Sequence, residues 1–269
     1  MQYDPIKRKL GAFFNKAPFL RILFYKLLDL LLLRAWHVKK ELKKWKKQDH
    51  FEKPDILDAG SGFGQYTYFM STMFDDYSIK AIDVKEEQIE DCNRFFRKIN
   101  KPEVVFELGD LTAYKVDNAY DLVLCVDVLE HIEEDVKVMS NFHQSLKEGG
   151  TLIISTPSDQ GGSDVHHEHE ASFIDEHVRD GYGIREIEDK LKQAGFSKVY
   201  PRYTYGRPGK ISWKLSMKYP ITLLNTSKFF YFLLPFYYLV AYPVSFIFNK
   251  FDVMLHHKTG TGLMVKAVK

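Results

Sequence analysis

Apolar residues recur at helical spacing near the start of the chain, over residues 19–47. The recurring positions are Leu20, Leu23, Phe24, Leu27, Leu31, Ala35, Val38, Leu42 and Trp45. This spacing predicts one long helix or two short ones. The basic end of the segment, "KKELKKWKK" at 39–47, suits two readings equally. The helix either packs on the rest of the protein with a solvated charged end, or rests on a membrane surface.

From residue 54 onward the pattern changes to short apolar runs that alternate with amphipathic stretches. The runs predict strands at 55–60, 78–84, 104–110, 120–128, 151–157, 196–205 and 261–268. Helices are expected at 86–99, at 184–195, and through "DVKVMSNFHQSLK" up to a stop at Gly149 and Gly150. The alternation predicts an α/β fold with a doubly wound sheet, in which ligands bind at the carboxyl ends of the strands.

The longest apolar run, "FFYFLLPFYYLVAYPVSFIF", occupies residues 229–248 and contains no charged side chain. Ten of its residues are Phe or Tyr, and its length could cross a lipid bilayer as a helix. Proline removes a backbone hydrogen bond from a helix. Pro235 and Pro243 are therefore expected to divide the run into pieces too short to span.

Charge is distributed in three blocks along the chain. Residues 1–50 carry 13 Lys or Arg against 4 Asp or Glu, residues 206–269 carry 9 against 1, and residues 51–205 carry 16 against 31. The acidic centre argues against nucleic acid as a partner, and the basic, aromatic ends suit an anionic membrane surface. The two cysteines, Cys92 and Cys125, have no metal-type spacing and fit a reducing compartment.

Candidate chemistry begins where the first predicted strand opens into the glycine loop "LDAGSGFGQYT", residues 57–67. The spacing differs from the G-x-G-x-x-G of dinucleotide enzymes and from the phosphate-binding loop. Asp83 and Asp110 close the next two predicted strands, where carboxylates could accept the hydroxyls of a ribose and the amino group of an adenine. Taken singly, each is more often a cap or a turn residue. Acidic residues at successive strand ends beside a glycine loop indicate a nucleoside site.

The segment "DVLEHI" at 127–132 completes a set of motifs with "LDAGSGFG", "IDV", "GDL" and "LKEGGTLIISTP". In this order the motifs resemble the class I S-adenosylmethionine-dependent methyltransferases, and most closely the small-molecule branch that includes the ubiquinone and menaquinone biosynthetic enzymes. The resemblance covers about residues 53–205 and the last strand. It implies a Rossmann-like, seven-stranded sheet. Ser61 stands where the family often has Cys, and Phe63 is bulky between glycines.

The resemblance also implies S-adenosylmethionine as cofactor and a role for each matching position. The methionine end would be held by Asp58, Gly60, Ser61, Gly62 and Gly64; the ribose by Asp83 and Val84; the adenine by Asp110 and Leu111; and the region of the sulfonium by Asp127 and Val128, with His131 close behind. An acidic, glycine-lined cleft suits this cofactor, because it is a cation without phosphates.

The methyl acceptor is expected under the segment after the fifth strand, residues 158–183. This segment holds four histidines, and three of them, His166, His167 and His169, are together with His131 the candidate catalytic bases. Their spacing matches no common metal signature, so no metal is expected. In-line positioning of acceptor, methyl and sulfur could also suffice without a base.

In this methyltransferase fold the last strand inserts antiparallel beside the sixth, so residues 206–258 become an insertion before a final strand at 259–269. The chain must then leave and return on the same side, as a hairpin that dips into one leaflet or as a lid; burial in a dimer is the remaining alternative. Residues 1–50 form a helical extension and 51–205 the cofactor-binding core. The oligomeric state is not predicted.

The expected function is O-methylation of a lipophilic acceptor, such as a quinone precursor, a phenolic polyene or a lipid. The expected place is the cytoplasm, peripheral on the inner face of the cytoplasmic membrane. One alternative is N-methylation of an amine-bearing lipid, and another is a non-catalytic cofactor-binding module that docks a partner through its hydrophobic ends. A nicotinamide-dependent dehydrogenase is disfavoured by the glycine spacing.

Overall fold

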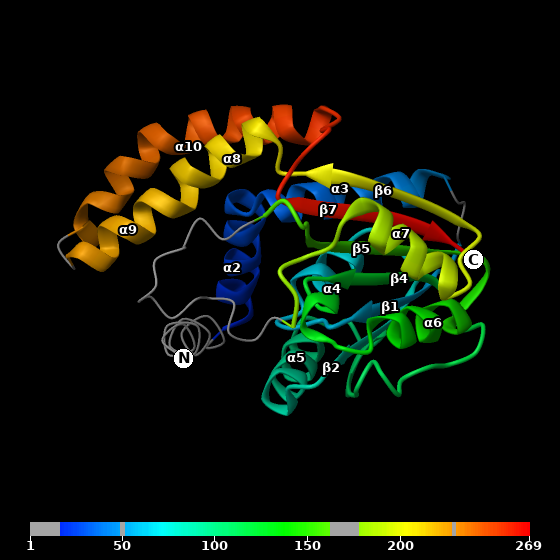
Figure 1. Cartoon of the computed structure of the whole chain (residues 1–269). Helices are drawn as coiled ribbons and strands as arrows, with labels where there is room; N and C mark the ends of the chain where they lie inside the picture. Colours follow the sequence, from blue (N-terminus) through cyan, green and yellow to red (C-terminus); the bar gives the residue numbers. More distant parts are fainter. Residues whose placement is uncertain (1–16, 49–51, 162–177, 228–229) are drawn as a thin grey trace.

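The computed structural model describes residues 17–48, 52–161, 178–227 and 230–269. Its centre is one seven-stranded sheet in the order β3-β2-β1-β4-β5-β7-β6 (Figure 1). The strands are β1 Asp55–Ala59, β2 Ser78–Asp83, β3 Val104–Leu108, β4 Tyr120–Val126, β5 Leu146–Pro157, β6 Lys198–Thr204 and β7 Gly262–Val268. The first five run parallel, and β7 lies antiparallel between β5 and β6. The predicted fold and the predicted pairing of the last two strands are therefore confirmed.

Helices cover both faces of the sheet. They include α4 Gln65–Met70, α5 Glu86–Lys98, α6 Asp135–Ser145 and α7 Ile184–Gln193. One apolar core joins the sheet to α6 and α7, and a second joins it to α5 and the N-terminal helices. The helix predicted through "DVKVMSNFHQSLK" is α6, and it ends at Ser145. Gly149 and Gly150 lie within β5, so the prediction that these glycines end the helix is wrong. Gly149 has φ +77°, which only a glycine adopts freely in a strand.

The N-terminal segment forms two helices, α2 Pro18–Leu31 and α3 Leu33–Gln48. They break at Leu32, which has an extended backbone. Tyr25, Val38, Leu42 and Trp45 are buried in the same core as α5, which confirms the packed reading for this face. Contact of the segment with a membrane stays a prediction.

Between β6 and β7 the described residues form a helical hairpin, and the name "hairpin" is kept for residues 207–227 and 230–254. The outgoing arm consists of α8 Arg207–Trp213, a π-helical turn η2 Lys214–Lys218 and α9 Tyr219–Thr226; the returning arm is α10 Phe230–Met254. Figure 1 shows the arms side by side, reaching away from the sheet. The hydroxyls of Tyr237 and Tyr238 donate to the carbonyls of Leu215 and Ser216 on the opposite arm, at 2.6 and 2.8 Å.

The prediction that the two prolines divide the apolar run is wrong, because α10 continues through Pro235 and Pro243. An interior proline costs a helix about 3 kcal/mol. Hydrogen bonds between the arms lie close to both prolines and offset part of this cost. Next to Pro243, the Ser212 hydroxyl donates to the Ser245 carbonyl at 3.1 Å. Among the described residues, α10 is the one helix long and apolar enough to cross a membrane, and its most apolar window is 11% buried. A single crossing is excluded because β6 and β7 are neighbours in the sheet.

A buried carboxylate, Asp252, fixes the base of the hairpin. One oxygen accepts a hydrogen bond from the Tyr205 amide at 3.1 Å and lies 2.8 Å from His37 Nε2. The other accepts from the Gly209 amide at 2.9 Å and lies 3.2 Å from His257 Nε2. Burial alone would raise the pKa of Asp252, but the two histidines and these hydrogen bonds outweigh it and lower the pKa. The carboxylate thereby ties both arms of the hairpin to α3 and β6.

Candidate active site

The glycine loop bends sharply between β1 and α4. Gly60, Gly62 and Gly64 all have positive φ values, of 78°, 51° and 75°. A Cβ atom on Gly60 would lie 2.2 Å from a methyl carbon of Val128, so no larger residue fits there. The amides of Gly60 and Ser61 both donate to the Ile82 carbonyl, at 2.8 and 3.0 Å. The loop is thus folded against the carboxyl end of β2.

Asp58 lies on β1 directly beneath the glycine loop and is 2% exposed. The Thr67 hydroxyl donates to its Oδ2 at 2.5 Å. Burial, helped by the charge of Asp83, raises the pKa of Asp58 to about 7, although the bond from Thr67 acts in the opposite direction. A carboxylate that is costly to ionise in a dry site is stabilised by a nearby cation. Asp58 can therefore stabilise a positively charged ligand.

The two carboxylates at the next strand ends are held at the same edge of the sheet. Asp83 closes β2; its Oδ2 accepts the Gly62 amide at 2.8 Å and its Oδ1 accepts the Lys85 amide at 3.0 Å. Each of these oxygens keeps acceptor capacity, because an ionised carboxylate offers about four sites. The neighbouring Val84 is 66% exposed and offers an apolar surface next to that carboxylate.

Asp110 follows β3, and the Thr112 amide donates to its Oδ1 at 2.8 Å. Leu111 beside it is buried, and its carbonyl accepts from the side-chain amide of Asn141 at 2.9 Å. Asp110 can stabilise this turn and also contact an adenine, because the turn uses only its Oδ1 and leaves Oδ2 as an acceptor.

Asp127 follows β4 in the left-handed region, with φ +51°. A non-glycine residue in this conformation is uncommon, costs about 1–3 kcal/mol and is found mostly at functional sites. The Asp127 amide donates to the Ser155 carbonyl at 2.8 Å, and its carboxylate forms an ion pair with Arg34 from α3. Val128 packs over Gly60. The structure thus brings the "DVLEHI" segment against the glycine loop.

His131 ends the short helix η1 Leu129–His131, and its side chain is exposed. The preceding Glu130 is buried, and its Oε2 accepts from the Thr156 hydroxyl at 3.0 Å. Burial raises the pKa of Glu130, whereas His131 and the Thr156 bond act in the opposite direction. The buried carboxylate next to His131 was not singled out from the sequence, although it stands within the motif.

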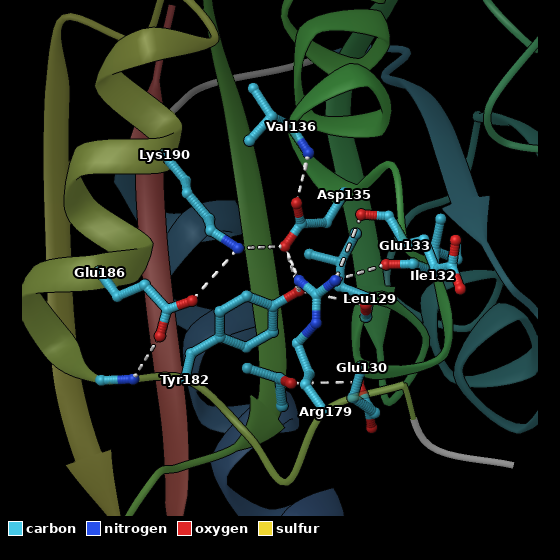
Figure 2. A network of polar contacts seen from close by, with 12 residues as sticks. Leu129, Glu130, Ile132, Glu133, Asp135, Val136, Arg179, Tyr182, Glu186 and Lys190 are labelled. Atoms are coloured by element: carbon cyan, nitrogen blue, oxygen red, sulfur yellow. Dashed lines mark hydrogen bonds and ion pairs between the residues drawn. The ribbon is translucent and has the colours of Figure 1, made fainter.

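A polar network, drawn in Figure 2, holds the segment with Glu130 and His131 in place. The carboxylate of Asp135, at the start of α6, accepts from Tyr182 at 2.8 Å and from Lys190 at 2.7 Å and pairs with Arg179. Arg179 also donates to the Ile132 carbonyl at 2.9 Å. These contacts attach the segment that begins at residue 178 to the loop after β4.

The N-terminal helices contribute to the site, which sequence reasoning missed. Arg21 Nη2 donates to the Phe63 carbonyl of the glycine loop at 2.9 Å, and the Tyr25 hydroxyl donates to the same oxygen. Arg21 also pairs with Asp91 on α5 at 2.8 Å. Arg21 thus attaches the N-terminal helices to the glycine loop, and Arg34 attaches them to Asp127 of the "DVLEHI" segment.

The remaining predicted bases, His166, His167 and His169, lie outside the described residues. Within the described ranges, no group of three or more His, Cys, Asp or Glu is arranged to hold a metal ion.

The arrangement fits S-adenosylmethionine. The four carboxylates at the strand ends, Asp58, Asp83, Asp110 and Asp127, suit a cation. The glycine loop permits close approach of the backbone. The Ser61 hydroxyl is buried without a hydrogen-bond partner among the described residues, and it is available to a polar ligand group. The fold and this edge of the sheet define the class I methyltransferase type.

Comparisons with known proteins agree with this class. A family described as a methyltransferase domain matches residues 50–195. The malonyl-[acyl-carrier protein] O-methyltransferase of Paenibacillus sp. (strain JDR-2) is 25% identical over 173 residues, 58% of this chain and 61% of the relative. The ubiquinone biosynthesis O-methyltransferase of Rickettsia akari (strain Hartford) is 28% identical over 107 residues, 40% of this chain and 41% of the relative.

Among solved structures, Haemonchus contortus phosphoethanolamine N-methyltransferase 2 in complex with S-adenosyl-L-methionine superimposes with a TM-score of 0.61. The identity is 18%, and the match covers 91% of this chain and 60% of that one. The matches span 61% and 41% of the two curated relatives, so the relatives' acceptors do not transfer directly. The chain belongs to the methyltransferase-domain family, and its cofactor is S-adenosylmethionine.

Proposed function

We propose that this protein methylates a lipophilic acceptor taken from a membrane surface, with a hydroxyl oxygen as the methylated atom. One observation carries the proposal. β6 runs parallel to β5, so the hairpin that follows it emerges at the carboxyl edge of the sheet, where the glycine loop and the four carboxylates lie. The hairpin exposes large aromatic and aliphatic side chains. An apolar surface of this size beside an active site favours an apolar partner.

The chain's residues have separable tasks in this reaction. Asp83 orients the ribose, and Asp58 stabilises the positive charge of the ligand. The bound cofactor supplies an electrophilic methyl group on a sulfonium. Arg34 holds Asp127 against that region, and the buried Glu130 lies next to His131. As a general base, His131 would take the proton of the acceptor hydroxyl as the new oxygen–carbon bond forms and the bond from the methyl group to the sulfonium sulfur breaks.

N-methylation of an amine-bearing lipid is the second candidate. The observation that favours it is the excess of carboxylates at the site, because Asp127 and Glu130 could attract a cationic head group. Hydroxyl methylation remains first because a histidine suits deprotonation of a phenol. A non-catalytic module is disfavoured by the intact set of cofactor residues. We also propose that the protein lies peripherally on the inner face of the cytoplasmic membrane.

An acceptor panel tests this function. Purified protein is incubated with S-adenosylmethionine carrying a labelled methyl group and with vesicles that contain a phenol on a polyprenyl tail, the same phenol without a tail, or phosphatidylethanolamine. The expected product is the methyl ether of the tailed phenol. Label on the amine lipid would establish the second candidate, and label on the tailless phenol alone would refute the requirement for an apolar acceptor.

His131 provides the residue-level test. His131→Asn should lower turnover by about 10²–10⁴-fold and leave the affinity for S-adenosylmethionine unchanged. Normal turnover would remove His131 from the proposed mechanism and leave positioning as the source of catalysis.

A further inference from the structure

The returning arm of the hairpin has its polar and apolar faces reversed relative to a helix of a water-soluble domain. The inner face consists of small or polar residues, Ala241, Ser245, Asn249 and Asp252, which are all buried. The outer face carries Phe232, Phe236, Leu239, Val240, Val244, Ile247, Phe251 and Met254, which are 42% to 75% exposed. In a water-soluble domain the apolar stripe of a helix faces the core.

The outgoing arm meets this inner face with small residues as well. Its buried positions are Gly209, Ser212, Ser216 and Pro220, spaced by three or four. Pairs of helices that pack through small residues and direct large apolar side chains outward are typical of a lipid environment, because lipid supplies the apolar surroundings. The small residues packed between the arms and the large apolar side chains exposed on α10 both favour lipid as the surroundings of the hairpin.

Cations decide how the hairpin can lie in lipid. The outgoing arm carries Arg207, Lys210 and Lys214 at helical spacing, and all three are exposed. The returning arm carries Lys250 near its base, also exposed. A hairpin that pointed deep into the bilayer would carry Lys214, and Lys218 at the end of η2, towards the hydrocarbon, where charge is disfavoured. The apolar stripe of α10 instead runs along its whole length, from Phe232 to Met254, as an arm lying flat requires.

We infer that the hairpin docks flat on an anionic lipid leaflet, with the outer face of α10 in the acyl boundary and Lys250, which lies on that face beside Phe251, at the level of the phosphates. The inference rests on the proposed function in one respect: the leaflet is the membrane surface from which the acceptor is taken. Asp252 ties the base of the hairpin to His37, one turn of α3 beyond Arg34, which pairs with Asp127 of the site.

Vesicle binding tests the surface without any measurement of methyl transfer. The full chain is sedimented with vesicles of phosphatidylcholine alone or mixed with phosphatidylglycerol. We expect binding to the mixed vesicles, weakened roughly tenfold by Lys250→Glu. The matched control is Lys198→Glu, an exposed lysine at the start of β6, which should bind as the wild type does.

The triple variant Phe236→Ser, Leu239→Ser, Val240→Ser should abolish binding and keep the fold, since among the described residues these are some of the most exposed large apolar side chains. If the wild type binds neither vesicle, or if the triple variant sediments with vesicles as the wild type does, the docking surface is refuted. A dimer that the triple variant dissociates, together with absent vesicle binding, would assign the face to a second copy of the chain. Methyl transfer to a detergent-dispersed acceptor would still succeed in that case, which separates this failure from failure of the proposed function.

Depth distinguishes a flat hairpin from an inserted one. Both native cysteines are buried, so a cysteine at an exposed position can be labelled selectively with a fluorophore. Phe232→Cys reports on the tip and Phe251→Cys on the base. Nitroxide-labelled lipids should quench both fluorophores at the same shallow depth. Deeper quenching at residue 232 than at residue 251 would contradict the flat orientation.

Discussion

The protonation state of Asp58 should control how tightly this protein binds S-adenosylmethionine. Burial raises the pKa of the Asp58 carboxyl to about 7. About 3% of the carboxyls are then ionised at about pH 5.5 and about half at about pH 7. If the carboxylate form binds the cationic cofactor, the association constant should rise roughly tenfold over this interval.

Isothermal titration calorimetry across this interval measures the effect. The Asp58→Asn variant should bind more weakly and lose the pH dependence. The control Asp121→Asn should retain it, because Asp121 pairs with Lys147 near the opposite end of β4. An affinity of the wild type that does not change with pH, or a slope that persists in Asp58→Asn, would refute the assignment of Asp58.

The same pKa has a consequence for stability. The folded protein holds the proton of Asp58 more tightly than the unfolded chain does, so this contribution to the free energy of unfolding is complete below about pH 4. It is lost as the pH rises towards 7, and the full loss is about 4 kcal/mol at most. Urea unfolding at about pH 8 should therefore find Asp58→Asn more stable than the wild type. Equal pH dependence in the two proteins would contradict the burial argument.

Three further changes test other parts of the structure. Asp83→Ala should weaken cofactor binding about tenfold or more in calorimetry without unfolding the domain, because the ribose loses its acceptor; unchanged binding would remove Asp83 from the site. Asp252→Ala should lower the free energy of unfolding by about 3 kcal/mol in urea, since His37 and two amides lose a buried partner, and a change below about 1 kcal/mol would contradict that role. Replacing residues 214–243 with a short linker should leave a folded, cofactor-binding protein that no longer sediments with anionic vesicles; failure to fold would show that the hairpin is part of the core.

Most of the candidate cofactor site could be predicted from the sequence because its parts are local. Asp58, Asp83 and Asp110 each stand at or next to the end of a short apolar run, and parallel strands bring their carboxyl ends to one edge. The glycines of the loop after β1 are needed where the backbone turns left-handed, and a single stretch of eleven letters, 57–67, contains them all.

The contacts of the N-terminal helices could not be predicted in this way. Arg21 reaches the Phe63 carbonyl across 42 positions of the chain, and Arg34 pairs with Asp127 from still farther away. Both arginines interrupt or follow an apolar run, where they look like solvated charges. Only the packing of α2 and α3 on the sheet brings them to the site.

The apolar run at 229–248 shows the limit of a local rule. Its two prolines predict interruptions, and α10 nevertheless continues through both. Hydrogen bonds from Tyr237 and Tyr238 to the opposite arm and the small residues between the arms supply the compensation. That compensation depends on the outgoing arm, which the pattern of the run alone does not reveal.

The most direct test of the central claim is mass spectrometry of lipid extracts from cells that carry the chain, lack it, or carry Asp83→Ala. The account predicts a lipophilic compound in the first cells that is replaced in the other two by a form lighter by one CH2 unit. Extracts that are identical in all three, together with a methylated product in the water-soluble fraction, would contradict a methyltransferase for lipophilic acceptors.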